Sequence, residues 1–308
     1  MRLKFLILSL CCLFISCSEP EPIKIGFLGS LSGRTADVSQ EVRDGILLAM
    51  EQVNAHGGIN GRIVELIVYD DQHDQAKAAE GVDYLADAGV VAIIGAVTSQ
   101  MATAATTQAN SREIVLLSPT ASTEELTGKE DFFFRTIATC GANARAMGRY
   151  AIDKLGVRRV AILNDQSNHA FTDSWQDSFE RQIKLSGGEV VTKVSYNSME
   201  DEFSFLELAK KILEQNPDGI LVLTNSIGTA IFCQQVDKLS EGRILMGSDW
   251  SFSGSLVQYG GKSVEGFTFT TNLDMNSTSP RFKQAKSEFH DRFRIEPKFP
   301  SFLAYEAS

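Results

Sequence analysis

Histidine is scarce in this sequence, and basic side chains form no block along it. The 308 residues include four histidines, His56, His73, His169 and His290, and none has the H-E-x-x-H spacing of a zinc peptidase. The 29 basic residues are outnumbered by 39 acidic ones, which argues against nucleic acid as a partner. We therefore expect the protein to bind no metal, no cofactor and no nucleic acid.

Phosphate-binding and nucleophile motifs are also missing. The stretch "IKIGFLGSLSG" at residues 23–33 is typical of an apolar strand that ends in a turn. Its glycines, Gly26, Gly29 and Gly33, do not fit G-x-G-x-x-G, and Leu31 stands where G-x-S-x-G needs its serine. We interpret the turn as a strand-to-helix loop that borders a cleft. Because no Ser/His/Asp set can be placed, we expect no enzyme.

Apolar runs long enough to cross a membrane are absent as well. The run from Phe5 to Ile15 follows two basic residues, as in a secretory signal. In "LFISC", Cys17 follows a small residue, which resembles a bacterial lipobox. We expect residues 1–17 to be a lipoprotein signal peptide, and the exported protein to be anchored by acyl chains at Cys17 in the periplasm or at the cell surface. The alternative is an ordinary signal peptide that contains a cysteine.

Little cysteine is left beyond this segment. Without its two basic residues the chain keeps 27 basic against 39 acidic residues, a net charge of −12. Cys140 and Cys233 lie far apart in sequence. They could pair in an oxidising compartment, but two buried free thiols are the interpretation we favour.

Strand-like and helix-like patterns alternate through the first part of the chain. Apolar, β-branched runs predict strands at Ile23–Leu28, Ile63–Tyr69, Val90–Ile94 and Ile114–Leu117. Helical periodicity predicts helices at Glu41–His56, Gln75–Ala88 and Ser99–Asn110. Short buried strands that alternate with helices indicate a parallel sheet with helices on both faces.

A second series of the same kind follows a join near Phe134–Ile137. Its predicted strands are Arg159–Leu163, Glu189–Ser195, Gly219–Leu223, Arg243–Met246 and a return strand at Gly266–Thr271. Its predicted helices are Ala142–Leu155, Phe171–Leu185, Phe203–Glu214, Gly228–Leu239 and Pro280–Arg294. The final "FPSFLAYEAS" is typical of another helix without a stop signal, which suggests a truncated chain. The fold class is therefore α/β, with two doubly wound parallel-sheet units in tandem.

Loops after the strands are the expected ligand site, because open parallel sheets bind ligands beyond the carboxyl ends of their strands. Thr98 and Ser99 lie at a predicted helix start, where free N–H groups and the helix dipole favour an anion. The alternative is that Ser99 only caps its own helix. The next loop, Ser118–Ser122, offers hydroxyl and amide groups with little side-chain bulk. Together the two loops form a plausible carboxylate cradle.

Two acidic stretches can be read in more than one way. Asp249 and Trp250 follow a predicted buried strand, where the acid could accept from an ammonium group and the indole could form a wall. The alternative is a solvated aspartate beside a core tryptophan. "YDDQHDQ" at Tyr69–Gln75 brings acids close to His73, which could indicate a metal site. We favour a strand end followed by a helix cap at Asp74.

Several motifs occur together in the order of one known family. They are "KIGFLGSLSG", "AMEQVNAHGGINGRIVELIVYDD", "VVAIIGAVTSQ", "LLSPTAS", "FFFRTI", "KLGVRRVAILND" and "SGGEVV". From Ile23 to its end the chain resembles the type I periplasmic binding proteins, in particular the leucine/isoleucine/valine-binding receptors of ABC transporters. "NAHGGINGR" followed by "YDDQHD" is rather specific to that branch.

The resemblance implies a two-lobed clamshell that holds an amino acid by both ends. Lobe one would comprise residues 18–135 plus 272–308, and lobe two residues 136–271. The family's residues match Ser99 and the segment Thr120, Ala121 and Ser122 for the carboxylate, with the Thr120 carbonyl and Asp249 for the ammonium group.

The side-chain subsite departs from the family pattern. A family aromatic aligns with Val38, a second with Phe171 or, in another alignment, His169, and a third with Ser226. Trp250 is a further candidate wall residue. The branch's disulfide, which would lie near His73 and Thr98, is absent, and the family also continues past residue 308.

Three functional hypotheses are considered. The first is a substrate-binding lipoprotein, acting as a monomer, that delivers an amino acid or similar amphiphile to an ABC permease in the membrane. The second is a ligand-sensing receptor of the same fold that signals to a membrane partner. A hydrolase built on His73 is a third reading, which a hydrolysis assay would test.

Overall fold

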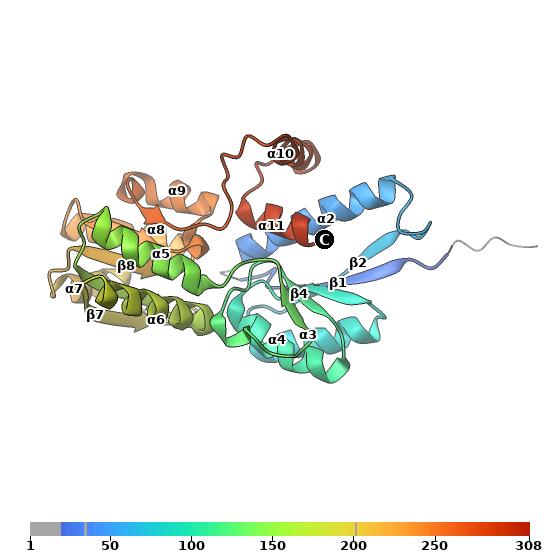
Figure 1. The fold of residues 1–308 in the computed structure, drawn as a ribbon, viewed down its shortest axis with the longest axis horizontal. Helices are drawn as coiled ribbons and strands as arrows, with labels where there is room; N and C mark the ends of the chain where they lie inside the picture. Colours follow the sequence, from blue (N-terminus) through green and yellow to red (C-terminus); the bar gives the residue numbers. More distant parts are fainter. Residues whose placement is uncertain (1–19, 34–35, 201) are drawn as a thin grey trace, which may run out of the picture.

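The computed structural model describes residues 20–33, 36–200 and 202–308 and contains two parallel five-stranded sheets, one beyond the other along the long axis (Figure 1). The fold class expected from the sequence is thus confirmed. Residues 1–17, with the proposed signal and Cys17, lie outside the described part. Within it, none of the helices combines the length and apolar character needed to cross a bilayer.

The first sheet has the order β2-β1-β3-β4-β5. Its strands are β1 (Ile23–Gly29), β2 (Val64–Asp70), β3 (Ala92–Gly95), β4 (Leu116–Ser118) and β5 (Phe133–Arg135). On one face α3 (Gln75–Asp87) and α4 (Ser99–Arg112) pack over Leu28 and Ile93. On the other, α2 (Ala36–Ala55) packs over Phe27 and Ile94. The short η2 (Glu124–Leu126) follows β4.

The second sheet has the order β10-β9-β8-β6-β7. Its strands are β6 (Arg159–Asp165), β7 (Glu189–Tyr196), β8 (Gly219–Leu223), β9 (Ile244–Gly247) and β10 (Thr268–Phe269). α5 (Cys140–Asp153) and α6 (His169–Leu185) cover one face, and α7 (Phe205–Leu213) and α8 (Ser226–Leu239) the other. Shorter helices complete the unit: η3 (Gln166–Asn168), η4 (Asp249–Ser251), α9 (Gly254–Gly260) and η5 (Gly261–Val264).

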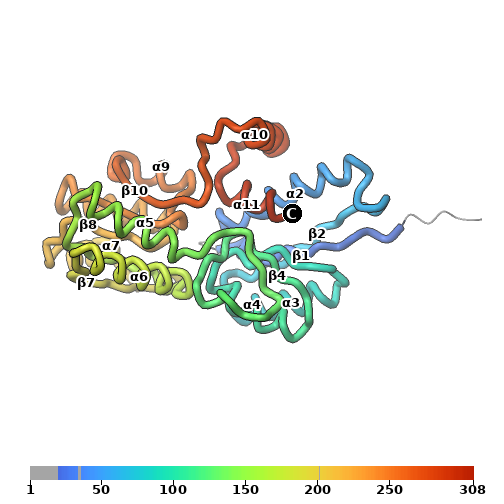
Figure 2. Tube along the Cα trace, viewed as in Figure 1, coloured from blue at the N-terminus to red at the C-terminus, as the bar shows by residue number. Residues whose placement is uncertain are grey.

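The C-terminal helices return to the first sheet. α10 (Pro280–Phe293) and α11 (Phe299–Ala307) lie beside α2, as Figures 1 and 2 show from the same side. Tyr305 donates to Gln52 Oε1 at 2.6 Å. The backbones of α2 and α11 come so close that a Cβ added at Gly45 would lie 2.1 Å from the Ser301 carbonyl oxygen. This packing carries Phe299, at the start of α11, to the junction of the two units.

Most sequence-based assignments hold, with ends that shift by a few residues. The structure adds β5 and α9, and α2 begins at Ala36 instead of Glu41. Asp74 caps α3 as predicted, accepting from Lys77 N at 3.0 Å. The described residues hold no cluster of three metal-ligating side chains, including around His73.

The two cysteines behave as the sequence suggested. Cys140 and Cys233 are free and buried. Burial raises the pKa of both thiols to about 12. The proposed lobe boundaries at residues 135/136 and 271/272 remain a prediction.

Candidate ligand-binding site

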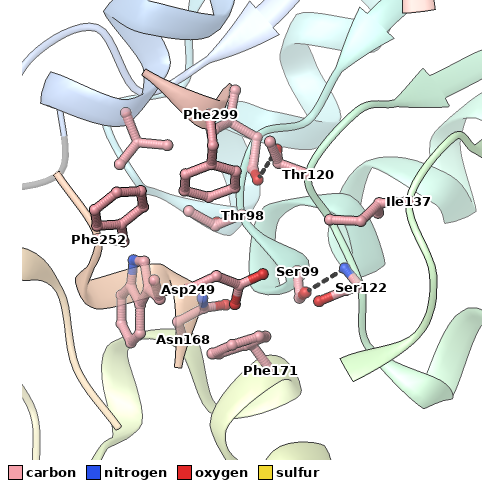
Figure 3. A pocket seen from close by; sticks show the side chains of 13 residues that line it. Thr98, Ser99, Thr120, Ser122, Ile137, Asn168, Phe171, Asp249, Phe252 and Phe299 are labelled. Carbon is pink, nitrogen blue, oxygen red and sulfur yellow. Dashed lines mark hydrogen bonds between the residues drawn. The ribbon is translucent and has the colours of Figure 1, made fainter. Parts of the chain in front are cut away.

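A cavity that opens to solvent lies between the two sheets, at the carboxyl ends of their strands (Figure 3). Both sheets contribute to its wall, together with the C-terminal α11. The lining residues are Val38, Val97, Thr98, Ser99, Thr120, Ser122, Ile137, Asn168, Phe171, Asp249, Trp250, Phe252 and Phe299.

One side of the cavity is a cluster of hydroxyl groups around the start of α4. Ser99 Oγ accepts hydrogen bonds from the backbone N–H groups of Ser122 at 3.1 Å and Thr123 at 3.2 Å. Thr98, not Ser99, caps α4, accepting from Met101 N at 3.4 Å. The alternative in which Ser99 caps its own helix is therefore wrong, because Ser99 is used to join α4 to the loop after β4.

The loop after β4 is held in place by two more hydroxyl groups. Thr120 Oγ1 donates to the Val97 carbonyl at 2.6 Å. Ser118 Oγ donates to the Ala96 carbonyl at 2.7 Å and accepts from Ala121 N at 3.0 Å. The loops after β3 and β4 therefore form one polar surface whose shape is fixed by hydrogen bonds to the backbone.

Asp249 lies across the cavity from Ser99, and its carboxylate points toward the Ser99 side in Figure 3. The side chain comes from η4, directly after β9, and only 7% of the residue is exposed. Asn272 Nδ2 donates to its Oδ2 at 3.0 Å. Burial still raises the pKa of this carboxyl to about 6. Asp249 is the one charged residue among the described residues that line the cavity.

Apolar side chains fill the wall between the two polar regions. Phe171 and Trp250 meet edge to face with ring centroids 5.9 Å apart. Phe252 lies 6.1 Å, centroid to centroid, from Phe299 of α11. Ile137, on the segment that joins the two sheets, packs in a cluster with Phe299 and Phe252. The cavity thus offers hydroxyl groups, one carboxylate and an aromatic-rich surface.

Direct contacts between the two sheet units border the cavity. Gln100 N donates to Asn168 Oδ1 at 3.0 Å, and Gln100 Oε1 accepts from Ala170 N at 3.1 Å. The His73 ring contacts the Ser167 carbonyl oxygen through Nε2 at 3.0 Å. These buried contacts fix Asn168 in the cavity wall and hold α4 against the start of α6.

The structure brings most of the predicted binding residues together. Ser99, Thr120, Ser122, Phe171, Asp249 and Trp250 all line the cavity. Trp250 and Asp249 thus face a shared space, in contrast to the alternative of a solvated aspartate beside a core tryptophan.

Three predicted residues lie outside the wall. Ala121 is fully buried behind it, and its N–H bonds to Ser118. His169 begins α6 and lines a separate groove with His73. Ser226 begins α8 and donates to Asp37 Oδ2 at 3.2 Å. Ala121 and Ser226 are held away from the cavity by these bonds, and His169 is exposed.

Sequence reasoning missed other wall residues. Asn168 and Phe252 are close in sequence to predicted residues, and this proximity was an available signal. Ile137 lies in the segment recognised as the join. Phe299 carried no sequence signal, because only the return of α11 to α2 brings it to the cavity.

The model of one protein family, described as periplasmic binding protein, matches residues 22–307. The chain belongs to the periplasmic binding protein family. That family consists of solute-binding proteins, and the resemblance inferred from the sequence is confirmed. Periplasmic binding proteins are exported, so this finding also agrees with an exported protein.

Curated relatives and solved structures of periplasmic binding proteins are similar to the chain. Leu/Ile/Val-binding protein homolog 3 of Brucella melitensis is 23% identical over 265 residues, which cover 85% of this chain and 70% of the relative. The leucine binding protein LivK of Thermotoga maritima has a TM-score of 0.85 at 24% identity, over 92% of this chain and 80% of that one.

Two other solved periplasmic binding proteins carry bound ligands. LivJ of Streptococcus pneumoniae, in complex with isoleucine, has a TM-score of 0.82 at 23% identity, over 93% of this chain and 81% of that one. A solute binding protein from R. palustris, in complex with benzoate, has a TM-score of 0.83 at 20% identity, over 93% of this chain and 78% of that one. The shared fold therefore holds both an amino acid and an aromatic acid.

Proposed function

We propose that this protein is the substrate-binding lipoprotein of an ABC importer and holds an amino acid or a similar small amphiphile between its two sheet units. One observation carries the proposal: the cavity sets a buried carboxylate, Asp249, with no cationic side chain among the described lining residues, opposite the hydroxyl cluster at Ser99. A zwitterion has the two charges that these two regions can hold.

The hydroxyl side suits a carboxylate. Ser99 and Ser122 present hydroxyl groups there, and the start of α4 adds the positive end of a helix dipole. Hydrogen bonds to a charged group contribute about 1.5–3 kcal/mol each. A ligand carboxylate in this position would complete the polar surface formed by the loops after β3 and β4.

The Asp249 side suits an ammonium group. An ionised carboxylate in a buried site is costly unless a cation is nearby, and the lining residues supply none within the described chain. A ligand ammonium would pair with Asp249, and the Thr120 carbonyl is a second acceptor. Pairing would lower the pKa of Asp249 from about 6 toward its ordinary value.

The centre of the cavity suits an apolar side chain. Val38, Phe171, Trp250 and Phe252 contribute aliphatic and aromatic surface. Burial of apolar area contributes about 25 cal/mol per Å². An amino acid with a branched aliphatic or aromatic side chain therefore fits the site better than a polar one.

Lobe one would comprise residues 18–135 with 272–308, and lobe two residues 136–271. Closure of the two lobes around the ligand would bury both polar regions and present a closed face to the permease. The acyl chains on Cys17 would keep the monomeric protein near the membrane.

A thermal-shift screen tests this function directly. Purified protein is heated with single amino acids, amino-acid amides and small carboxylates, and a binder raises the melting temperature by mass action. We expect amino acids with large apolar side chains to give the largest shifts. The amides, which lack the carboxylate, should give none. If no zwitterion shifts the melting temperature, the proposed ligand class is wrong.

A further inference from the structure

Asp37 in the first turn of α2 connects the two sheet units at one side of the cavity. Its Oδ2 accepts from Ser226 Oγ at 3.2 Å and from Ser253 Oγ at 3.4 Å. Ser226 begins α8, and Ser253 is the N-cap of α9. One carboxylate of the first unit therefore contacts the starts of two helices of the second. The positive end of the α8 dipole favours an acid at this position.

The residues of this contact are immediate chain neighbours of cavity-wall residues. Asp37 precedes Val38, and Ser253 follows Phe252. A displacement of either contact residue therefore displaces a side chain that a ligand would touch. The contact and the cavity wall are coupled because their residues are consecutive in the chain.

A third segment meets the others at the same place. Lys298, which precedes the wall residue Phe299, forms an ion pair with the buried Glu41 of α2. Lys298 also lies against the start of α9, since a Cβ added at Gly254 would be 3.1 Å from Lys298 Cε. Each of the apolar wall residues Val38, Phe252 and Phe299 is therefore next in sequence to a residue that makes a polar contact with another segment.

We propose that Asp37, Ser226 and Ser253 form a latch that holds the cavity closed around its ligand and positions Val38 and Phe252 for side-chain selectivity. The proposal rests on the proposed binding function for its ligand. It also gives Ser226 a role that differs from ligand contact, because its hydroxyl is engaged by Asp37.

The physical effect of a latch is on the closed state. Contacts made only when the two units meet shift the equilibrium toward the closed form, and they slow ligand escape more than they alter ligand entry. A contact that merely stabilised α2 would instead change the melting temperature of the ligand-free protein and leave ligand escape unchanged.

Dissociation of isoleucine, used as the probe, tests the latch. Trp250 lines the cavity and supplies a fluorescence signal for stopped-flow measurements. The variants are Asp37→Ala, Asp37→Asn and Ser226→Ala/Ser253→Ala, with Glu51→Ala as control. Glu51 is a carboxylate near the other end of the same helix and forms an ion pair with Arg292 of α10.

We expect dissociation about tenfold faster in Asp37→Ala and in the double serine variant, as for the loss of about 1.4 kcal/mol of closed-state stabilisation. The triple variant Asp37→Ala/Ser226→Ala/Ser253→Ala should release isoleucine at about the same rate as Asp37→Ala, because all three changes remove the same contact. The ratio of the affinities for isoleucine and phenylalanine should also change in these variants and not in Glu51→Ala. Unchanged dissociation and an unchanged ratio would overturn the latch.

A second measurement separates this proposal from the proposed function. Hydrogen exchange in ligand-free protein is followed at the start of α8 and at the start of α9, with and without Asp37→Ala. Faster exchange at both places supports the latch even if isoleucine does not bind. Equal exchange with unchanged dissociation would remove the latch alone, whereas the absence of a melting-temperature shift with every zwitterion of the screen would remove the proposed function.

Discussion

Ser99 Oγ accepts hydrogen bonds from two consecutive backbone N–H groups, and the nearer is that of Ser122 at 3.1 Å. This bond joins the start of α4 to the loop after β4, so two loops that are separate in sequence form one surface. Ser99 therefore both shapes the hydroxyl side of the cavity and lies in its wall.

Ser99→Ala should weaken amino-acid binding by roughly 1–3 kcal/mol, since it removes a hydroxyl group and leaves two buried N–H groups without their acceptor. Isothermal titration calorimetry measures the change. Ser111→Ala, near the other end of the same helix, is the control and should bind as the wild type does. Equal affinity in both variants would exclude a role for Ser99 in the site.

Asp249→Asn discriminates between classes of ligand. For a zwitterion, the loss of the ion pair should weaken binding by roughly 1.5–3 kcal/mol. For a carboxylate without an ammonium group, such as benzoate, removal of the facing negative charge should leave affinity unchanged or increase it. Calorimetry with both ligands gives the answer, and Asp291→Asn on the exposed face of α10 is the control.

Ligand affinity should fall as the pH drops through about 6. The ammonium group pairs with ionised Asp249, and the raised pKa of this carboxyl means that it is protonated in the free protein below that pH. Binding at pH 5.5 should therefore release a proton, which calorimetry in buffers of different ionisation enthalpy detects. A pH-independent affinity between 5 and 7.5 would contradict pairing with Asp249.

The stability of the ligand-free protein should fall as the pH rises, whereas ligand affinity should increase as the pH rises through about 6. Burial raises the pKa of Asp249 to about 6 and that of Glu41 to about 7. Raised carboxyl pKa values mean that the folded state binds more protons, so the contribution of these two groups to stability is full below about pH 4 and is lost as the pH rises through 6 and 7. Asp249→Asn should stabilise the protein at pH 7 by about 3 kcal/mol, measured by urea unfolding. A destabilised variant at that pH would be the contrary result.

Gly45→Ala should separate α2 from α11. The added Cβ would approach the Ser301 backbone oxygen to 2.1 Å, and backbone cannot rotate away as a side chain can. We expect a loss of about 1–3 kcal/mol in stability and weaker ligand binding, because Phe299 moves with α11. Gly148→Ala in α5 is the comparison, since its Cβ would lie 2.9 Å from Gln182 Cγ, on a side chain that can shift, and 3.5 Å from the Phe179 backbone oxygen, an ordinary contact distance. Similar stabilities of the two variants would argue against tight packing here.

Cys17→Ser should abolish membrane attachment if the lipobox prediction is correct. In bacterial cells, radioactive palmitate should label the wild type and not the variant, and the variant should be recovered in the soluble fraction. Cys233→Ser, a buried residue of α8, should keep the label. Labelled Cys17→Ser protein would show that the attachment site lies elsewhere.

Local patterns predicted the parts of this structure that depend on local chemistry. The β-branched strands, the amphipathic helices and the Asp74 cap were all found from the sequence, because each is determined by residues within a few positions. The loops at Ser99, Ser122 and Asp249 were found because strand ends in parallel sheets meet at one edge.

Contacts between distant segments could not be found in the same way. β5 has three residues, too few for a clear period, and it overlaps the join predicted near Phe134–Ile137. The packing of Phe299 into the wall depends on α11 lying against α2, a contact over roughly 250 positions of sequence. Ser226 was expected to touch the ligand because nothing local shows that Asp37 takes its hydroxyl.

The two sheet units have separate hydrophobic cores, and the cavity wall takes residues from both. A molecule held there touches both bodies at once, so its binding energy is lost when either body melts. Scanning calorimetry of the empty protein should therefore resolve two overlapping heat-absorption peaks, and a saturating guest should merge them into one sharper peak at higher temperature.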